Sequence, residues 1–106
     1  MNPENLKTLG EMRAVEVEKN VLGWYFITYV DGKEDLGSTV IEAYGPADAA
    51  LRSSEAGVDP GRGSIRMTTV APVQLPPADK RGRFLTPAEV KGLWPAVAAA
   101  TGEGNA

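Results

Sequence analysis

The side chains available for chemistry in this chain are limited to carboxylates, lysines, tyrosines and hydroxyls. Its 106 residues include neither cysteine nor histidine. This removes disulfides, zinc-thiolate sites and thiol nucleophiles, together with the most common general base and transition-metal ligand. Ser53, Ser54 and Ser64 have no histidine to activate them, and no spacing brings two carboxylates to one cleft. We expect no catalytic residue, no metal and no cofactor, and therefore a protein that is not an enzyme.

An acidic group formed by Asp31, Glu34 and Asp35 invites comparison with a calcium-binding loop. Its spacing lacks the alternating oxygen ligands and the distal glutamate of an EF-hand. Asp31 is followed by Gly32, and the Asp-Gly pair is a strong signal for a tight turn. We interpret the group as a solvated turn.

A glycine-rich stretch with Gly57, Gly61 and Gly63, flanked by Arg62 and Arg66, has the composition of an anion-binding loop. Phosphate-binding loops lead into the N-terminus of a helix, whereas this one is expected to leave a helix and enter a strand. No Gly-Lys-Ser/Thr follows, so the stretch is not a P-loop. We interpret it as a helix cap followed by a turn.

Nucleic-acid or anion binding is the alternative function that the basic residues suggest. Aromatic side chains on a sheet can stack bases, and basic loops at 62–66 and 80–83 could form a patch beside them. The candidate binding residues are Tyr25, Tyr29, Arg62, Arg66, Lys80, Arg81 and Arg83. Against this reading, the formal net charge is -3, and the aromatic-glycine signature of an RNA-recognition motif is absent. Nucleic acid is therefore the less favoured partner.

The strongest secondary-structure signal is the uncharged run Trp24-Tyr25-Phe26-Ile27-Thr28-Tyr29-Val30. Its β-branched and aromatic residues are typical of a strand. One face would carry Trp24, Phe26, Thr28 and Val30, and the other Tyr25, Ile27 and Tyr29. A half-exposed strand alternates apolar with polar residues, so we expect this strand at the centre of a sheet.

The other elements follow from turn and cap signals. Residues 36–43 should pair with residues 24–31 as an antiparallel hairpin, and residues 46–56 should form a helix with an alanine-rich face. A third strand is expected over 64–71, and the capping-box pattern at 86–89 predicts a short last helix. The order β-β-α-β-α predicts an α+β fold, in which a helix crosses over a small sheet that contains the hairpin.

The two ends of the chain give weaker signals. Residues 1–22 are expected to be a poorly defined N-terminal arm: a short helix ended by Gly10, then an extended segment in which valines alternate with glutamates. We interpret the glutamates of this arm as a solvated face, with a docking arm for a basic partner as the alternative. They are Glu4, Glu11, Glu16 and Glu18.

The chain should therefore be one domain over residues 23–94, followed by a flexible tail at 95–106. Neither a basic stretch followed by an apolar one at the start nor a membrane-length apolar run is present. We expect a cytoplasmic protein without membrane contact.

Three segments carry a resemblance to known sequences: Trp24–Tyr29, then Leu36-Gly37 with Val40–Ala43, then Ala49-Ala50 with Gly57–Gly61. Over about residues 24–70 the chain resembles a set of small uncharacterised bacterial and phage-encoded proteins. Because that family has no settled activity, the resemblance implies a fold and lends no site residues, cofactor or partner.

The two apolar faces of the central strand predict a function more directly. Helix 46–56 offers only a narrow stripe, which covers one face of a small sheet. The other face must be covered by the C-terminal segment, through Leu85, Val90, Leu93 and Trp94, or by a second protein. We therefore expect a small protein-interaction module that acts as a homodimer or with another protein. Its contact surface would be the aromatic sheet face or a strand edge.

Overall fold

The fold is α+β, as the sequence predicts, and is built on a three-stranded antiparallel sheet with the order β2-β1-β3. The computed structural model describes residues 3–93, with side chains described for residues 7–92. The strands are β1 (Gly23–Asp31), β2 (Glu34–Ala43) and β3 (Ser64–Val70). The helices are α1 (Pro3–Lys19), α2 (Pro46–Glu55) and α3 (Pro87–Leu93), with short 3-10 turns at Pro72–Gln74 and Ala78–Lys80.

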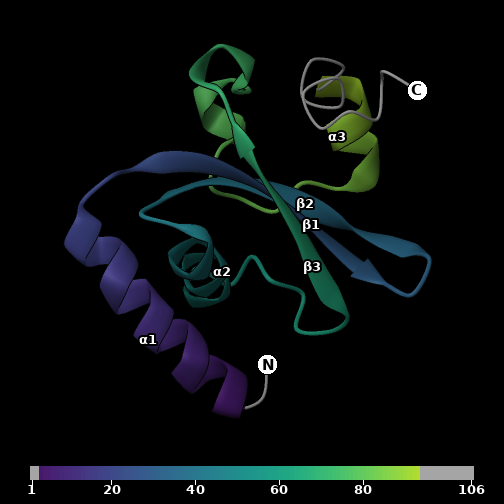
Figure 1. Ribbon diagram of the computed structural model, residues 1–106. Coiled ribbons are helices and arrows are strands. Elements are labelled where there is room, and N and C mark those ends of the chain that lie inside the picture. The colour runs from purple at the N-terminus through teal and green to yellow at the C-terminus, as the bar shows by residue number, and fades with distance from the viewer. Residues whose placement is uncertain (1–2, 94–106) are drawn as a thin grey trace.

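The sheet is covered on both sides by the chain's own segments (Figure 1). Helix α2 lies on one face, with α1 packed beside it, and the segment that ends in α3 lies on the other. β1 is the central strand, and Ile27 and Tyr29 in it have no exposed surface. The predicted central placement of this strand is therefore confirmed.

The two faces of β1 belong to separate apolar clusters, as its sequence indicates. Ile27 and Tyr29 pack with Ala43, Ala49 and Val58 on the α2 side. The cluster on the opposite face joins residues of β1 and β2 to the C-terminal segment; its members are Val40, Leu85, Trp24, Phe26, Leu75 and Val90. Burial of one leucine side chain contributes about 1.5–3 kcal/mol, so both coverings contribute substantially to stability.

The β1–β2 hairpin has a tighter turn than the sequence analysis predicts. Asp31 pairs with Glu34, so only Gly32 and Lys33 lie between the strands, and Gly32 has a φ of 62°. The extra residue appears further along, where Leu36 forms a bulge between the pairs Tyr29–Gly37 and Val30–Asp35. The predicted loop at 31–35 is therefore too long, because its acidic residues are part of the ladder.

The free side of β2 is closed by residues 82–85. The Ser38 N–H donates to the Leu85 oxygen at 2.8 Å, and the Leu85 N–H donates back to the Ser38 oxygen at 2.7 Å. The Gly82 N–H donates to the Val40 oxygen, and the Thr39 hydroxyl donates to the Arg83 oxygen. Residues 82–85 thus form a short strand-like segment, which also places the fully buried Leu85 on the second face.

The predicted extended arm at the N-terminus is wrong, because α1 is one helix through Lys19. Gly10 is exposed inside this helix and does not end it; Asn20, with a φ of 57°, follows its last residue. Val15 and Val17 are 54% and 43% exposed, so their alternation with glutamates does not reflect a strand face. Polar side chains of α1 hold this helix against α2 instead.

Glu16 joins α1 to the N-terminus of α2. Its two carboxylate oxygens accept the N–H groups of Asp48 and Ala47, at 2.8 and 3.0 Å. Gly45 makes this approach possible, because a Cβ at this position would overlap the Glu16 side chain. A carboxylate there satisfies free N–H groups and complements the positive end of the helix dipole. The solvated role predicted for Glu16 is therefore wrong, because its acceptors are used inside the protein.

Asp48 is the buried centre of the same junction. Its side chain has no exposed surface, and Arg13 Nε donates to its Oδ1 at 2.7 Å. The Tyr44 N–H donates to its Oδ2, and Arg52 Nε lies 2.9 Å from that oxygen without hydrogen-bond alignment. Burial acts to raise the pKa of Asp48, but the Tyr44 N–H and the two guanidinium groups outweigh it and lower this pKa.

Both predicted helix caps are present. Glu89 and Thr86 exchange the two hydrogen bonds of a capping box at the start of α3. At the end of α2, the N–H groups of Gly57 and Val58 donate to the oxygens of Ser54 and Ser53, and Gly57 has a φ of 73°.

Gly37→Ala is expected to destabilise the protein by about 3 kcal/mol. The φ of Gly37 is 133°, and a Cβ there would overlap the Phe84 ring and lie 2.6 Å from the Leu85 oxygen. Gly61→Ala is the matched control, since Gly61 also has a positive φ but no atom near its Cβ position; it should cost about 1 kcal/mol. Urea unfolding measures both values. Equal losses would contradict a close contact between residues 84–85 and β2.

Asp48→Asn should cost about 2 kcal/mol at pH 7, because it leaves two arginines without their carboxylate. The pKa of Asp48 is lowered by folding, so its contribution is present above the unfolded value of about 3.9 and is lost as pH falls through the folded value. The stability difference between wild type and variant should therefore shrink toward pH 3. Glu11→Gln removes the same charge from an exposed position and serves as the control. A difference that stays constant from pH 7 to pH 3 would contradict this account.

Candidate functional site

The outer edge of β3 is the open edge of the sheet. Within residues 3–93, β3 pairs with β1 alone, whereas the corresponding edge of β2 is closed by residues 82–85. Alternate residues of an edge strand direct their N–H and C=O groups away from the sheet. Such a row of groups is a template on which another strand can pair.

β3 lacks the features by which natural proteins protect an edge. Its residues Ser64–Val70 contain a single charge, Arg66, and no lysine or proline. Its seven pairs with β1 run without a register shift, so no bulge turns the edge away. Edge strands that must stay unpaired are usually short, twisted by bulges or guarded by lysine and proline. β3 therefore differs from β2, which has both a bulge and a cover.

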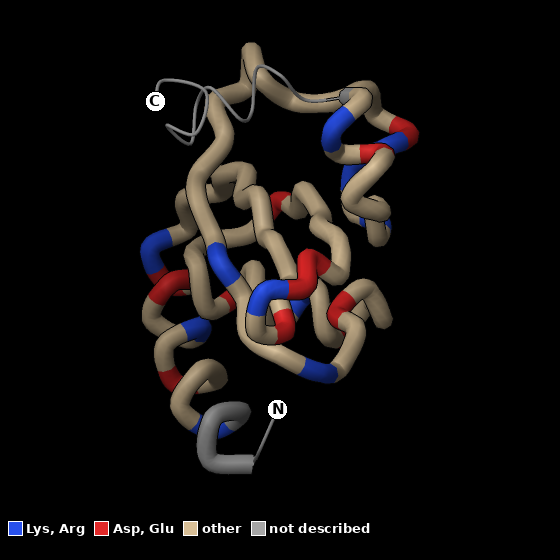
Figure 2. The backbone as a smooth tube through the Cα atoms, turned by 90° about the vertical axis from the view of Figure 1, so that its right-hand side faces the viewer, with Lys and Arg blue, Asp and Glu red and all other residues tan. Residues whose placement is uncertain are grey.

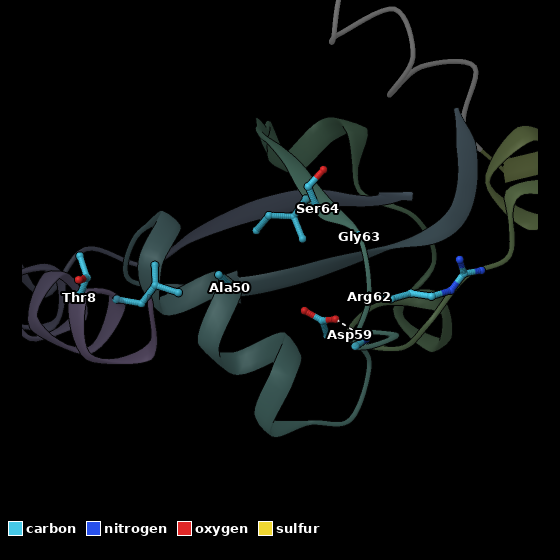
Figure 3. Close-up of a pocket in the computed structure, with 9 residues that line it drawn as sticks. Thr8, Ala50, Asp59, Arg62, Gly63 and Ser64 are labelled. Atoms are coloured by element: carbon cyan, nitrogen blue, oxygen red, sulfur yellow. Dashed lines mark hydrogen bonds between the residues drawn. The ribbon is translucent and has the colours of Figure 1, made fainter. Parts of the chain in front are cut away.

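A groove borders β3 on the α2 side (Figure 3). We call it the β3 groove; it has a volume of about 470 Å³ and is lined by Thr8, Leu9, Ala50, Asp59, Gly61, Arg62, Gly63, Ser64 and Ile65. Its walls come from α1, from α2 and from the turn that enters β3. The Arg62 side chain extends away from Thr8 and Ala50. Ile65 is 38% exposed, so an apolar side chain of the edge strand lies open beside this groove.

A second depression borders β3 on the opposite face. We call it the β3 hollow; it has a volume of about 500 Å³ and is lined by Phe26, Thr28, Val30, Gly32, Lys33, Asp35, Arg66, Met67 and Thr68. Its charged side chains come from the hairpin and from β3. The open edge therefore has an apolar side chain over one depression and a cationic side chain over the other.

Arg66 differs from the other arginines of the chain. All six arginines lie in the described part, and five of them contact a carboxylate, a backbone oxygen or an aromatic ring. Arg62, for example, binds Asp31 and Glu34 and so ties the 59–63 turn to the hairpin. Among the described side chains, residues 7–92, Arg66 has no such partner, and it is exposed. Its guanidinium group is available to a ligand.

The basic residues of the 80–83 loop lie across the sheet from Arg66, next to β2. Arg81 donates to the Pro76 oxygen and lies over the Trp24 ring, 5.4 Å from its centroid. Arg83 binds Glu89 and the Phe84 oxygen. The half-buried Lys80 belongs to the same loop. Figure 2 shows positive and negative segments interleaved along the chain. The 80–83 loop adjoins β2 and the 62–66 loop leads into β3, so the two loops lie at opposite edges of the sheet.

Tyr25 and Tyr29 lie on the sheet face that α2 covers. Tyr29 has no exposed surface; its burial raises the pKa of its hydroxyl to about 12, and the hydroxyl lies near Ser53 without an aligned hydrogen bond. Tyr25 is half-buried, and burial also raises its pKa, with a contribution from Glu16. Tyr29 therefore presents no open ring face of the kind that base stacking uses, and Tyr25 packs against the same apolar cluster.

The acidic hairpin residues are used within the fold. Asp31 and Glu34 bind Arg62, and the Asp35 carboxylate accepts the Gly37 N–H at 3.0 Å. Among the side chains of residues 7–92, no three carboxylates gather closely enough to hold a metal ion. The same part of the chain has no helix long and apolar enough to cross a membrane.

Comparison with protein-family models, curated proteins and solved structures finds no match to this chain. The resemblance over residues 24–70 to uncharacterised bacterial and phage-encoded proteins stays a prediction. The β3 edge and the two depressions beside it are the features of this protein that indicate a function.

Sequence reasoning identified Arg66 as a candidate but grouped it with residues that lie elsewhere. It did not identify Ile65, Leu9 or Ala50, which line the β3 groove. A usable signal was present in β3 itself, because a seven-residue strand with one charge and no proline is unusual for an exposed edge. That signal has meaning only once β3 is known to be an edge strand.

Amide hydrogen exchange should show the open edge directly. In the free protein, alternate amides of β3 should exchange rapidly because they point away from β1, while the amides of residues 25–30 should be the slowest in the protein. Residue-resolved exchange measured by NMR gives both patterns in one experiment. Uniform slow exchange along residues 64–70 would show that the outer edge is already paired.

Proposed function

We propose that this protein is a small non-catalytic interaction module that binds a partner protein by adding one of the partner's strands to β3. The observation that carries the proposal is the seven-residue edge of β3, which is open and unprotected, whereas the chain itself closes the opposite edge of the sheet. In strand addition, main-chain hydrogen bonds supply affinity and side-chain pockets on either face supply specificity. β3 has a depression on each side for the second purpose.

The aromatic sheet face is the less suitable surface for a partner. On the α2 side, Ile27 and Tyr29 are fully buried. On the other side, Trp24 and Phe26 pack with Leu85, which belongs to the chain's own C-terminal segment. A partner would have to displace these contacts, whereas the β3 edge can pair without any displacement within residues 3–93.

Nucleic-acid binding receives less support from the same geometry. A nucleic-acid surface needs several cations free to meet phosphates. The arginines of the two basic loops, Arg66 excepted, already bind carboxylates or backbone oxygens. The two candidate tyrosines lie beneath α2 rather than on an open sheet surface.

Site-specific photo-crosslinking in cells that naturally produce the protein tests the proposal. A photoreactive residue in place of Thr69, which is exposed on β3, should give a discrete covalent adduct with one protein. The same residue in place of Ala88, exposed on α3, is the matched control and should give no such adduct. Mass spectrometry of the adduct identifies the crosslinked partner residue and shows whether it belongs to an extended segment.

Two results would contradict the proposal. One is an adduct that forms at the Ala88 position and not at the Thr69 position. The other is an adduct with nucleic acid, removed by nuclease, at the Thr69 position. Either result would mean that the β3 edge is not where this protein meets a partner protein.

A further inference from the structure

We infer that the partner strand at β3 carries a carboxylate that pairs with Arg66, next to apolar residues that enter the β3 groove. The partner would therefore be an extended segment with an apolar–acidic–apolar pattern. This inference depends on the proposed strand addition, and it specifies the chemical class of the partner.

The alternation of side chains along β3 determines this pattern. Ile65 and Arg66 are neighbours, so their side chains point to opposite faces of the sheet. Ile65 lines the β3 groove and Arg66 lines the β3 hollow. A residue of an added strand opposite Arg66 points to the hollow side, while the residues before and after it point to the groove side.

The free guanidinium group of Arg66 selects the charge of the partner residue. Arginine presents a planar set of donors that matches a carboxylate, and every other arginine in the described chain already has a partner. Lys33 also lines the hollow, opposed by Asp35, so the charges there sum to one positive unit. A negative side chain complements this surface, whereas a positive one would be repelled.

The groove side selects apolar side chains. Leu9 on α1, Ala50 on α2 and Ile65 on β3 give it three apolar walls that meet beside the open edge. Ile65 is 38% exposed in the free protein, so covering it with a partner side chain removes apolar surface from water. Branched aliphatic side chains suit this position because they also favour an extended backbone.

A second copy of this chain is a poor occupant of the same edge. β3 contains no carboxylate, so an antiparallel β3–β3 pair gives Arg66 no anionic partner within either strand. In the register centred on residue 66, the two arginines would face each other, which is unfavourable. The two copies also carry net charges of the same sign. The charge pattern thus favours a different chain with an acidic segment.

A pair of synthetic peptides tests the inference. Each is nine residues long and alternates valine with threonine, and its central threonine is replaced by glutamate in one peptide and by lysine in the other. Amide chemical shifts of the full-length, isotope-labelled protein report binding at residues 64–70, and titration gives the affinities. The glutamate peptide should bind wild type on the order of fivefold more tightly than the lysine peptide, as expected for one exposed ion pair.

Arg66→Glu should reverse this order, so that the lysine peptide binds more tightly. Lys91→Glu applies the same charge reversal at an exposed residue of α3 and should leave the order unchanged. Ile65→Ser should weaken both peptides by a similar factor, because both use the groove. The wild-type affinity ratio should persist in that variant.

The outcomes distinguish strand addition at β3 from the acidic character of the partner strand. If both peptides shift the β3 amides with equal affinity, and Arg66→Glu changes neither, strand addition stands and the acidic partner is excluded. If neither peptide shifts residues 64–70, the edge does not accept a strand, and the proposed function falls together with the inference. A wild-type protein that is a dimer through β3 in solution would also overturn the inference, because the edge would then be filled by a second copy.

Discussion

Because β1 is apolar on both faces, both faces of this central strand must be removed from water. Ile27 and Tyr29 are covered by α2, and Trp24 and Phe26 by the segment that contains Leu85. The crossover helix between β2 and β3 meets the first requirement, because it returns the chain across the face of the sheet. The C-terminal segment meets the second and, by pairing with Ser38, also closes the outer edge of β2. The outer edge of β3 is what these coverings leave open.

The position of α1 follows from electrostatics more than from apolar packing. Its contact face contains Leu9, Arg13 and Glu16, two of which are charged. Glu16 reaches the free N–H groups of α2 because Gly45 has no side chain, and Arg13 neutralises the buried Asp48. This junction has a consequence for the site, because Leu9 forms one wall of the β3 groove. A charged contact at the N-terminus of α2 thus helps to shape the apolar side of the open edge.

The contrast between the two edges of the sheet gives the functional proposal its physical basis. A strand from another chain can pair with an exposed edge without large rearrangement, because the unpaired backbone groups are already in place. Proteins usually prevent this unwanted pairing with charge, proline or bulges. This chain applies such measures at β2 and not at β3. Backbone pairing alone would accept many sequences. The exposed Ile65 and the free Arg66, on opposite faces of β3, add specificity for the side chains of the partner strand.

The elements that could be predicted from the sequence are those whose signals are local or strictly periodic. These include the central aromatic strand, the hairpin at Asp31-Gly32, the cap of α2 at Gly57 and the capping box at Thr86, because each depends on neighbours within a few residues. Tertiary structure alone decided the course of α1, since its stabilising partners are polar and more than thirty residues away, where periodicity analysis does not reach. Tertiary structure also determines which of the candidate arginines has no carboxylate or backbone oxygen as a partner among the described residues. Arg62, Arg66, Arg81 and Arg83 look alike in sequence, but the structure gives them different partners. Arg62 binds carboxylates 31 and 28 residues away, whereas Arg81 and Arg83 bind a backbone oxygen and a carboxylate 5 and 6 residues away. Arg66 is left beside an open edge.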